Sequence, residues 1–179
     1  FGFNSVSVDL IYGLPKQSVQ GFARTLDTVL SVRPNRFAVY AYAHLPQMFK
    51  PQKQIKVEDL ATPETRLQLL ELTIDKLSAA GYIYIGMDHF ALPDDELVLA
   101  QESGTMYRNF QGYSTRGYCD LVGLGVSSIG KVGDHYIQNL KTLPEYYGAI
   151  DRGELPVHRG YTMTGDDVIR RDVIQQIMC

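Results

Sequence analysis

The sequence contains only two cysteines among its 179 residues, Cys119 and Cys179, and they lie far apart. They form no CxxC pair and no disulfide framework. These residues alone therefore cannot hold a zinc ion or an iron–sulfur cluster through cysteine. So little cysteine is typical of a reducing compartment, and we expect the protein to be cytoplasmic.

Basic charge and long apolar runs are also scarce. The formal net charge is −3, and there is no basic block of the kind that neutralises phosphates in nucleic-acid-binding proteins. No apolar run approaches the roughly 20 residues that cross a bilayer, and no secretory signal pattern begins the chain. We therefore expect no nucleic-acid partner and no membrane span. We also expect a monomer.

Apolar residues make up 45% of the sequence, enough for a sizeable core. At both ends of the sequence a secondary-structure pattern is cut off. Phe1 runs almost directly into a strand-like segment, and an amphipathic helix over residues 167–179 has no stop signal. We expect the chain to be a piece of a longer protein.

Hydrophobic periodicity predicts alternating strands and helices. Strands are expected over 5–12, 37–43, 82–88 and 121–129, and helices over 18–32, 62–81 and 94–102. This order is typical of βαβ units in an α/β fold, but four strands are too few for a closed barrel of roughly 250 residues. We predict half of a (β/α) barrel or an open doubly wound sheet over residues 1–134. A mostly helical region follows over 135–179, with capping boxes at Thr142–Glu145 and Thr164–Asp167.

Polar residues gather at the carboxyl ends of the predicted strands, where parallel α/β folds bind their ligands. Asp9 alternates with Val8 and Leu10, so we expect it to point away from the helices, into the barrel interior with Ser7. A carboxylate there requires a partner, either a ligand or a basic residue in a structural salt bridge. The pattern leaves both alternatives open.

Other strand-end residues have structural explanations as well as functional ones. His44, Asp88 and His89 resemble metal ligands in type, but their spacing matches no ligand motif, and structural histidines are the favoured interpretation. We expect His135 and His158 at the surface. The segment Arg170–Asp172 is typical of a solvated helix face.

Two loops suggest a ligand instead. Gly123 and Gly125 lack the rest of a dinucleotide fingerprint, and small residues there favour close approach to a flat ligand. The polar and aromatic loop Asn109–Thr115 is suited to a large planar, acidic molecule, with Gln111 supplying direction. An ordinary tight loop is the alternative.

Taken together, these motifs resemble the oxygen-independent coproporphyrinogen III oxidases of the radical S-adenosylmethionine (SAM) superfamily. The matching segments are Val8–Gln17, Tyr42–Pro46, Gly86–Ala91, Asn109–Tyr113, Gly123–Ile129 and Asp166–Ile174. They occur in the right order over nearly the whole chain. The first is shared with related heme-trafficking proteins, whereas Tyr42–Pro46 and Asn109–Tyr113 resemble the true oxidases.

The resemblance implies a partial barrel of the radical SAM type and a helical C-terminal domain. It also implies that a [4Fe–4S] cluster cleaves SAM to a 5′-deoxyadenosyl radical, which takes a hydrogen from the β-carbon of a propionate. Loss of CO₂ then leaves a vinyl group. Two propionates of coproporphyrinogen III are converted, giving protoporphyrinogen IX in heme biosynthesis. Two SAM molecules, an electron donor and an electron acceptor are implied as partners.

The same resemblance assigns roles to individual residues. Asp9, the backbone of Ala43 and the side chain of Ile129 would contact SAM, and Gln111 would lie near the reacting propionate. The family's CxxxCxxC motif is absent, so we expect the cluster ligands N-terminal to Phe1 and no activity from this chain alone.

Two other functions compete with this interpretation. A heme chaperone of the related radical SAM family would keep the barrel without the oxidase chemistry, but Tyr42–Pro46 and Gln111 argue against it. A metal-dependent hydrolase would use Asp9, His44 and Asp88, and stoichiometric zinc in the purified chain would support it.

Overall fold

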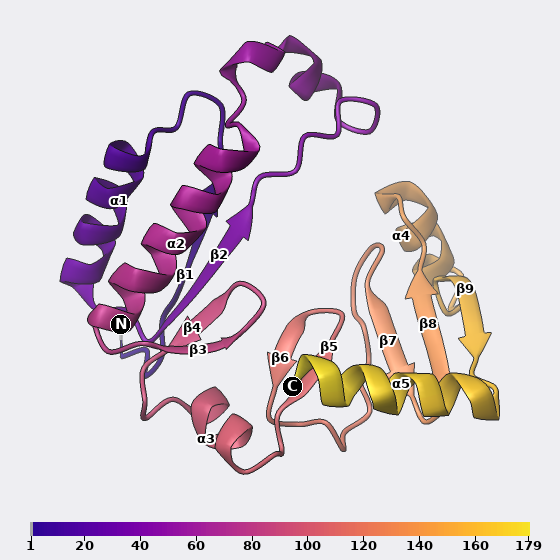
Figure 1. Cartoon of the computed structure of the whole chain (residues 1–179). Helices are drawn as coiled ribbons and strands as arrows, with labels where there is room; N and C mark the ends of the chain where they lie inside the picture. Colours follow the sequence, from indigo (N-terminus) through magenta and orange to yellow (C-terminus); the bar gives the residue numbers. More distant parts are fainter. Residues whose placement is uncertain (1) are drawn as a thin grey trace. The chain divides into compact units, whose positions relative to one another are not determined.

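The computed structural model describes residues 2–179 and divides into two compact units (Figure 1). The N-terminal unit is Phe1–Ser103 and the C-terminal unit is Gly104–Cys179. The predicted domain division after residue 134 falls inside the C-terminal unit, in the turn between two paired strands, and stays a prediction. None of the helices in residues 2–179 is long and apolar enough to cross a membrane.

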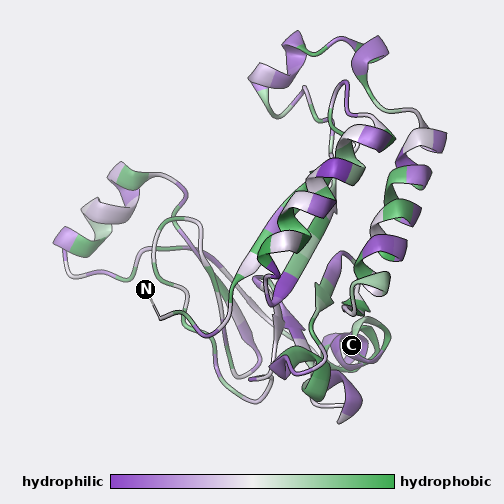
Figure 2. Cartoon of the chain, turned by 90° about the vertical axis from the view of Figure 1, so that its left-hand side faces the viewer, coloured by the Kyte–Doolittle hydropathy of each residue, from purple (hydrophilic) through white to green (hydrophobic). Residues whose placement is uncertain are grey.

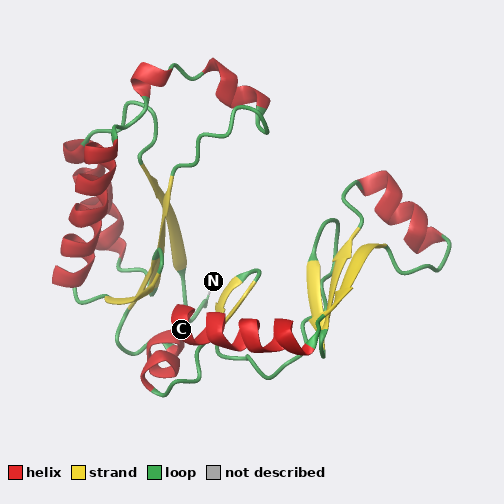
Figure 3. Cartoon of the chain, turned by 45° about the vertical axis from the view of Figure 1, so that its right-hand side comes forward, coloured by secondary structure: helices red, strands yellow, loops and turns green. Residues whose placement is uncertain are grey.

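The N-terminal unit is an open sheet with helices on one face, as the α/β prediction requires. Strands β1 (Ser7–Tyr12) and β2 (Arg36–Ala41) pair in parallel, joined by helix α1 (Val19–Val32). Helix α2 (Pro63–Ala79) follows two short 3₁₀ helices, η1 (Lys50–Gln54) and η2 (Val57–Asp59). Figure 3 shows α1 and α2 on the same side of the two strands.

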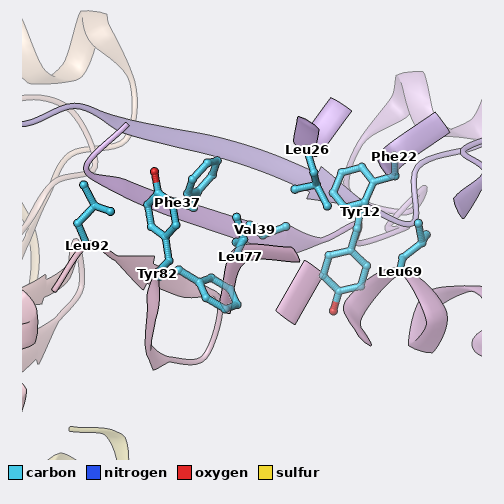
Figure 4. Close-up of a cluster of buried hydrophobic side chains, with 10 residues drawn as sticks. Tyr12, Phe22, Leu26, Phe37, Val39, Leu69, Leu77, Tyr82 and Leu92 are labelled. Carbon is cyan, nitrogen blue, oxygen red and sulfur yellow. The ribbon is translucent and has the colours of Figure 1, made fainter. Parts of the chain in front are cut away.

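The core of this unit lies between the sheet and these two helices. Val8, Leu10 and Tyr12, which alternate along β1, face the helices and pack into it. Figure 4 shows the buried cluster at this interface. Its members are Tyr12, Phe22, Leu26, Phe37, Val39, Leu69, Leu77, Tyr82, Phe90 and Leu92. Each fully buried leucine or phenylalanine stabilises the fold by about 1.5–3 kcal/mol, so this layer fixes which face of the sheet remains open.

Both core helices begin where the sequence predicts. The Ser18 hydroxyl accepts the Gly21 backbone N–H, and the Thr62 hydroxyl accepts that of Thr65. Hydrophobic and hydrophilic stretches alternate along the two helices (Figure 2), as expected where one face packs and the other meets water.

The third predicted strand forms, but it is the first arm of a hairpin. Strand β3 (Ile83–Gly86) turns back through β4 (His89–Ala91), and β4 lies between β3 and β2, antiparallel to both. Gly86 and Met87 adopt positive φ values of 145° and 50°, which reverses the chain. The strand predicted over 82–88 is thus present as β3 but ends at Gly86, and its antiparallel partner β4 was not predicted.

A buried ion pair joins β2 to helix α3 (Glu96–Glu102). The Arg36 Nε donates to Asp95 Oδ2 at 2.7 Å, and the Asp95 side chain is 4% exposed. Asp95 also caps α3, since its Oδ1 accepts the Leu97 N–H at 2.8 Å. One carboxylate thus fixes both the sheet edge and the start of α3.

The C-terminal unit contains a small hairpin, a three-stranded sheet and two helices. Strands β5 (Tyr107–Asn109) and β6 (Gly112–Ser114) pair with each other. Strands β7 (Ile129–Val132), β8 (His135–Asn139) and β9 (Val157–Thr162) form an antiparallel sheet. Residues 135–179 thus hold two strands beside helices α4 (Leu143–Asp151) and α5 (Gly165–Met178).

The fourth predicted strand, over 121–129, is mostly a loop. Leu121 forms an isolated bridge with Lys131, and regular pairing starts only at Ile129. The buried Asn139 side chain holds the loop, because its Nδ2 donates to the Gly123 and Gly125 carbonyls, both at 3.0 Å. The prediction missed this because the glycine-rich stretch bonds to a side chain rather than to a strand.

The two predicted capping boxes differ in outcome. At α5 the box forms: the Thr164 hydroxyl accepts the Asp167 N–H, and the Asp167 carboxylate accepts the Thr164 N–H. At α4 it does not, because the Thr142 hydroxyl donates to Glu145 Oε2 at 2.6 Å instead of accepting a backbone N–H.

Candidate functional site

The face of the N-terminal sheet opposite α1 and α2 is open. Asp9 on β1 pairs in register with Ala38 on β2, which pairs in turn with His89 on β4. Paired residues share a face, so these three form one row across the sheet. Asp9 is exposed there, which is the orientation that the alternation along β1 predicts.

Asp9 makes no ion pair and no hydrogen bond to the rest of residues 2–179. The structural salt bridge that the sequence left open is therefore not formed in the described part of the chain. A carboxylate in that position remains available to a hydrogen-bond donor or a cation from outside.

The loop after β1 is held in place by one amide. The Gln17 Oε1 accepts the backbone N–H of Gly13 at 2.6 Å and that of Leu14 at 3.3 Å, and its Nε2 donates to the Ile11 carbonyl at 3.1 Å. Gly13 has φ +79°, a region that favours glycine. These bonds fix the edge of the sheet just beyond Asp9.

The loop after β2 lies beside the loop after β1. The Tyr42 N–H donates to the Tyr12 carbonyl at 2.8 Å, and the Arg66 guanidinium donates to the Tyr42 carbonyl. Ala43 is exposed, and its carbonyl accepts Gln52 Nε2 at 3.1 Å. The structure thus places Asp9 and Ala43 in the same unit, with Ala43 at the carboxyl end of β2.

The strand-end histidines have aromatic neighbours. His44 Nδ1 lies 3.4 Å from the Tyr42 hydroxyl, and the His89 ring meets the Tyr40 ring edge-on at 6.0 Å between centroids. Residues 2–179 bring no three His, Cys, Asp or Glu side chains together in an arrangement suited to a metal ion. The metal-dependent hydrolase alternative therefore has no ligand set in the described chain.

Gln111 and Ile129 both belong to the C-terminal unit. Gln111 is exposed in the turn of the β5–β6 hairpin, where its backbone N–H donates to Asn109 Oδ1 at 2.8 Å. Ile129 opens β7 and lines a cavity of about 350 Å³, together with Phe110 and Tyr136. Since Phe110 precedes Gln111, the hairpin turn and Ile129 adjoin one cavity.

A larger cavity of about 940 Å³ lies in the same unit, bounded by the β5–β6 hairpin, the β7–β9 sheet and α5. Four aromatic side chains line it: Tyr107, Phe110, Tyr136 and Tyr161. Basic side chains outnumber acidic ones in the lining. The basic set is Arg108, Arg116, Lys131, Arg170 and Arg171, and the acidic set is Asp120 and Asp167.

Arg108 is held tightly at the cavity. Its backbone N–H donates to Gln175 Oε1 at 3.0 Å, and its carbonyl accepts Gln175 Nε2 at 2.6 Å, which ties β5 to α5. The guanidinium carbon lies 4.7 Å from the centroid of the Tyr113 ring, within cation–π range. Arg108 Nη1 is buried and has no hydrogen-bond partner among the described residues.

Two tyrosines of the cavity keep their protons over a wide pH range. Burial, followed by the nearby Tyr107, raises the pKa of Tyr136. The hydrogen bond from the Tyr161 hydroxyl to Asp167 Oδ2, 2.7 Å long, raises the pKa of Tyr161. Hydrogen bonds from Thr164, then that from Tyr161, lower the pKa of Asp167 to about 2. The Asp167 carboxylate is thus already hydrogen-bonded within the protein by Thr164 and Tyr161.

The residues predicted to lie at the surface agree with the structure except for Arg171. His135 and His158 are exposed, as predicted. Of the expected solvated helix face, Arg170 is 73% exposed, but Arg171 is only 23% exposed and contacts Asp134 and Asp172. Arg108 and Tyr136 were not predicted from the sequence, because segments far apart in the chain form their cavity.

The class of protein follows from a solved structure. The chain superposes with a TM-score of 0.95 on coproporphyrinogen III oxidase (HemN) from Escherichia coli, described as a radical SAM enzyme, at 51% identity. The match covers 99% of this chain and 41% of that chain. The predicted partial α/β barrel of the radical SAM type is therefore confirmed. No family model matches the chain.

Proteins with similar sequences identify the kind of radical SAM enzyme that the chain resembles. Oxygen-independent coproporphyrinogen III oxidases from Pseudomonas aeruginosa and Salmonella typhimurium are 54% and 52% identical to the chain, each over 99% of its length. The chain spans only 38% and 39% of those two proteins. The resemblance expected from the motifs is thus confirmed: the chain is similar, almost throughout, to one segment of these oxidases.

Proposed function

We propose that this chain is part of an oxygen-independent coproporphyrinogen III oxidase, which converts two propionates of its substrate to vinyl groups and yields protoporphyrinogen IX. The observation that carries the proposal is the exposed, unpaired Asp9 carboxylate on the open sheet face. It is supported by 51–54% identity to such oxidases over 99% of the chain. The named relatives favour this function over the heme chaperone.

The residues of this chain do not fit a [4Fe–4S] cluster. Such a cluster takes cysteine thiolates, and the chain has only Cys119 and Cys179, one of them exposed at the larger cavity and the other at the end of α5. In the proposed enzyme the cluster therefore belongs to residues outside this sequence.

The residues do fit part of a SAM site. Asp9 has the charge to hold the ammonium or ribose hydroxyls of SAM, and Ala43 is exposed with only a methyl side chain beside its backbone, which leaves room for SAM to approach. In the C-terminal unit, taken by itself, Ile129 lines the cavity of about 350 Å³ and is proposed to contact SAM through its apolar side chain. When bound, SAM supplies the group that removes a hydrogen from the substrate. We propose two SAM molecules, because two propionates react in turn.

Gln111 is proposed to act on the substrate side. Its carboxamide makes no hydrogen bond to the other described residues, so both its donor and its acceptor are available. A carboxamide there can hold a propionate carboxylate at a fixed distance from the group that reacts with it. The proposed oxidase works as a cytoplasmic monomer, with an electron donor and an acceptor still to be identified.

A chimera tests the function directly. This chain replaces the corresponding segment of the Escherichia coli enzyme, to which it is 51% identical over 178 residues. Anaerobic turnover of coproporphyrinogen III, measured by chromatography of the oxidised porphyrins, is expected within about tenfold of the parent. A folded chimera that binds the cluster and cleaves SAM, yet forms no vinyl product, would contradict the proposal.

A further inference from the structure

We propose that the larger cavity of the C-terminal unit binds a large molecule bearing several carboxylates, and that Arg108 is the residue that neutralises one of them. Its identification with coproporphyrinogen III rests on the proposed function. The chemistry of the site rests on the cavity itself, whose lining belongs entirely to the C-terminal unit.

The size and lining suit a large ligand with apolar rings. A volume of about 940 Å³ lies near the upper end of the 300–1,000 Å³ typical of small-molecule sites. Aromatic side chains from β5, β8 and β9 provide broad apolar surfaces around it. Such surfaces pack well against the pyrrole rings of a tetrapyrrole and poorly against a small polar metabolite.

The charge of the lining selects an anion. Five basic side chains face two acidic ones, and the Asp167 carboxylate is already used by Thr164 and Tyr161. Of the basic set, Arg170 and Arg171 have carboxylate partners within the chain. Arg108 and Lys131 make no ion pair in residues 2–179. The fifth, Arg116, donates to the Tyr118 hydroxyl at 3.0 Å. Arg108 and Lys131 are therefore the two cations considered for the ligand.

Arg108 is the better anchor of the two. A buried guanidinium nitrogen without an acceptor is costly, and a carboxylate entering beside it removes that cost. The backbone clamp by Gln175 and the Tyr113 ring limit the conformations of this residue before a ligand arrives. Little ordering entropy is then lost on binding.

SAM also carries a carboxylate, but it fits this cavity less well. Its sulfonium and ammonium groups give it a net positive charge, which a positive lining repels. Coproporphyrinogen III carries four propionates and no cationic group. The charge balance therefore favours the substrate over a second SAM as the occupant.

The test uses the chimeric enzyme and coproporphyrin III, a fluorescent stand-in for the substrate. Arg108→Met should weaken its binding about 10- to 100-fold, the loss expected for a charge-assisted hydrogen bond, and raise KM while kcat stays closer to its original value. Arg108→Lys should recover part of the affinity, since the charge returns without the guanidinium fork. Arg152→Met, on exposed α4 outside the cavity, should bind as the unsubstituted chimera.

The tetramethyl ester of coproporphyrin III, which lacks the carboxylate charges, tests whether Arg108 acts through a carboxylate. It should bind the unsubstituted chimera and Arg108→Met equally, because it has no charge for Arg108 to meet. Equal binding of the free acid by both proteins would overturn the inference, as would displacement of coproporphyrin III by excess SAM. Failure of the proposed function is distinct: the unsubstituted chimera would then make no vinyl product, whatever Arg108→Met does to binding.

Discussion

Asp9 and His89 lie in one row on the open face of the N-terminal sheet, separated only by Ala38. Two strand spacings of about 4.8 Å put their backbones about 10 Å apart. The helices cover the other face, where Val8 and Leu10 pack. The core of this unit thus supports a face on which the Asp9 carboxylate is exposed and the His89 imidazole is half-buried.

Asp9→Asn is the sharpest test of that surface. The substitution keeps the size of the side chain and removes its charge, so SAM affinity of the chimera should fall about 10- to 100-fold. Equilibrium binding of SAM and anaerobic SAM cleavage measure the effect. Asp75→Asn, on the exposed face of α2, is the matched control and should change neither. SAM affinity within twofold of the unsubstituted chimera would remove Asp9 from the proposed site.

The sequence predicted the parts of the fold that depend on neighbouring residues. Ser18 and Thr62 cap their helices because a hydroxyl needs only the first turn to bond with. The alternation of Val8, Asp9 and Leu10 predicted the open and covered faces of β1, because a strand has a period of two. These signals are local, and nothing distant in the chain overrides them.

What remained unpredicted depends on segments distant in the sequence or on unusual backbone. The β3–β4 turn places Met87 at positive φ, where a methionine is uncommon, so no turn signal was visible. Arg108 and Gln175 are 67 positions apart, and their paired hydrogen bonds create one wall of the larger cavity. The periodicity within each segment cannot predict that the two segments contact each other.

The buried pair between Arg36 and Asp95 should govern the stability of the N-terminal unit. Arg36→Met leaves the 4%-exposed Asp95 carboxylate without its cation, and we expect a loss of about 2–3 kcal/mol in the free energy of unfolding. The loss is below that of a fully buried pair because the Arg36 side chain is 23% exposed. Urea unfolding measures it, with Arg152→Met as the control, since that arginine is in an exposed pair expected to contribute little. Equal destabilisation by both variants would contradict this assignment.

Asp167 should make the start of α5 sensitive to acid. Its pKa is about 2 in the folded chain against an ordinary 3.8, because Thr164 and Tyr161 hydrogen-bond the charged form. A lowered pKa stabilises the fold above the ordinary value, and that contribution is lost as the pH falls from about 4 through 2. The protection factors of the amide hydrogens in the first α5 turn, which are corrected for the intrinsic pH dependence of exchange, should therefore fall across that interval. Asp167→Asn should exchange faster at neutral pH and show less change on acidification, whereas an unchanged acid response in this variant would exclude Asp167 as the cause.

Gly13 should be the position where the loop after β1 tolerates a side chain least. Its φ of +79° disfavours an L-residue by about 1–2 kcal/mol, and an added Cβ would lie 3.2 Å from Arg66 Nε. Because Arg66 also donates to the Tyr42 carbonyl, Gly13→Ala should disturb the loop that carries Ala43. We expect a loss of about 1–3 kcal/mol in stability together with weaker SAM binding by the chimera.

Gly81→Ala separates backbone strain from the contact with Arg66. Gly81 has φ +87° but no atom near its added Cβ, so this variant should lose stability while its SAM binding is unchanged. If both variants bind SAM equally well, the contact between Gly13 and Arg66 does not position the Ala43 loop.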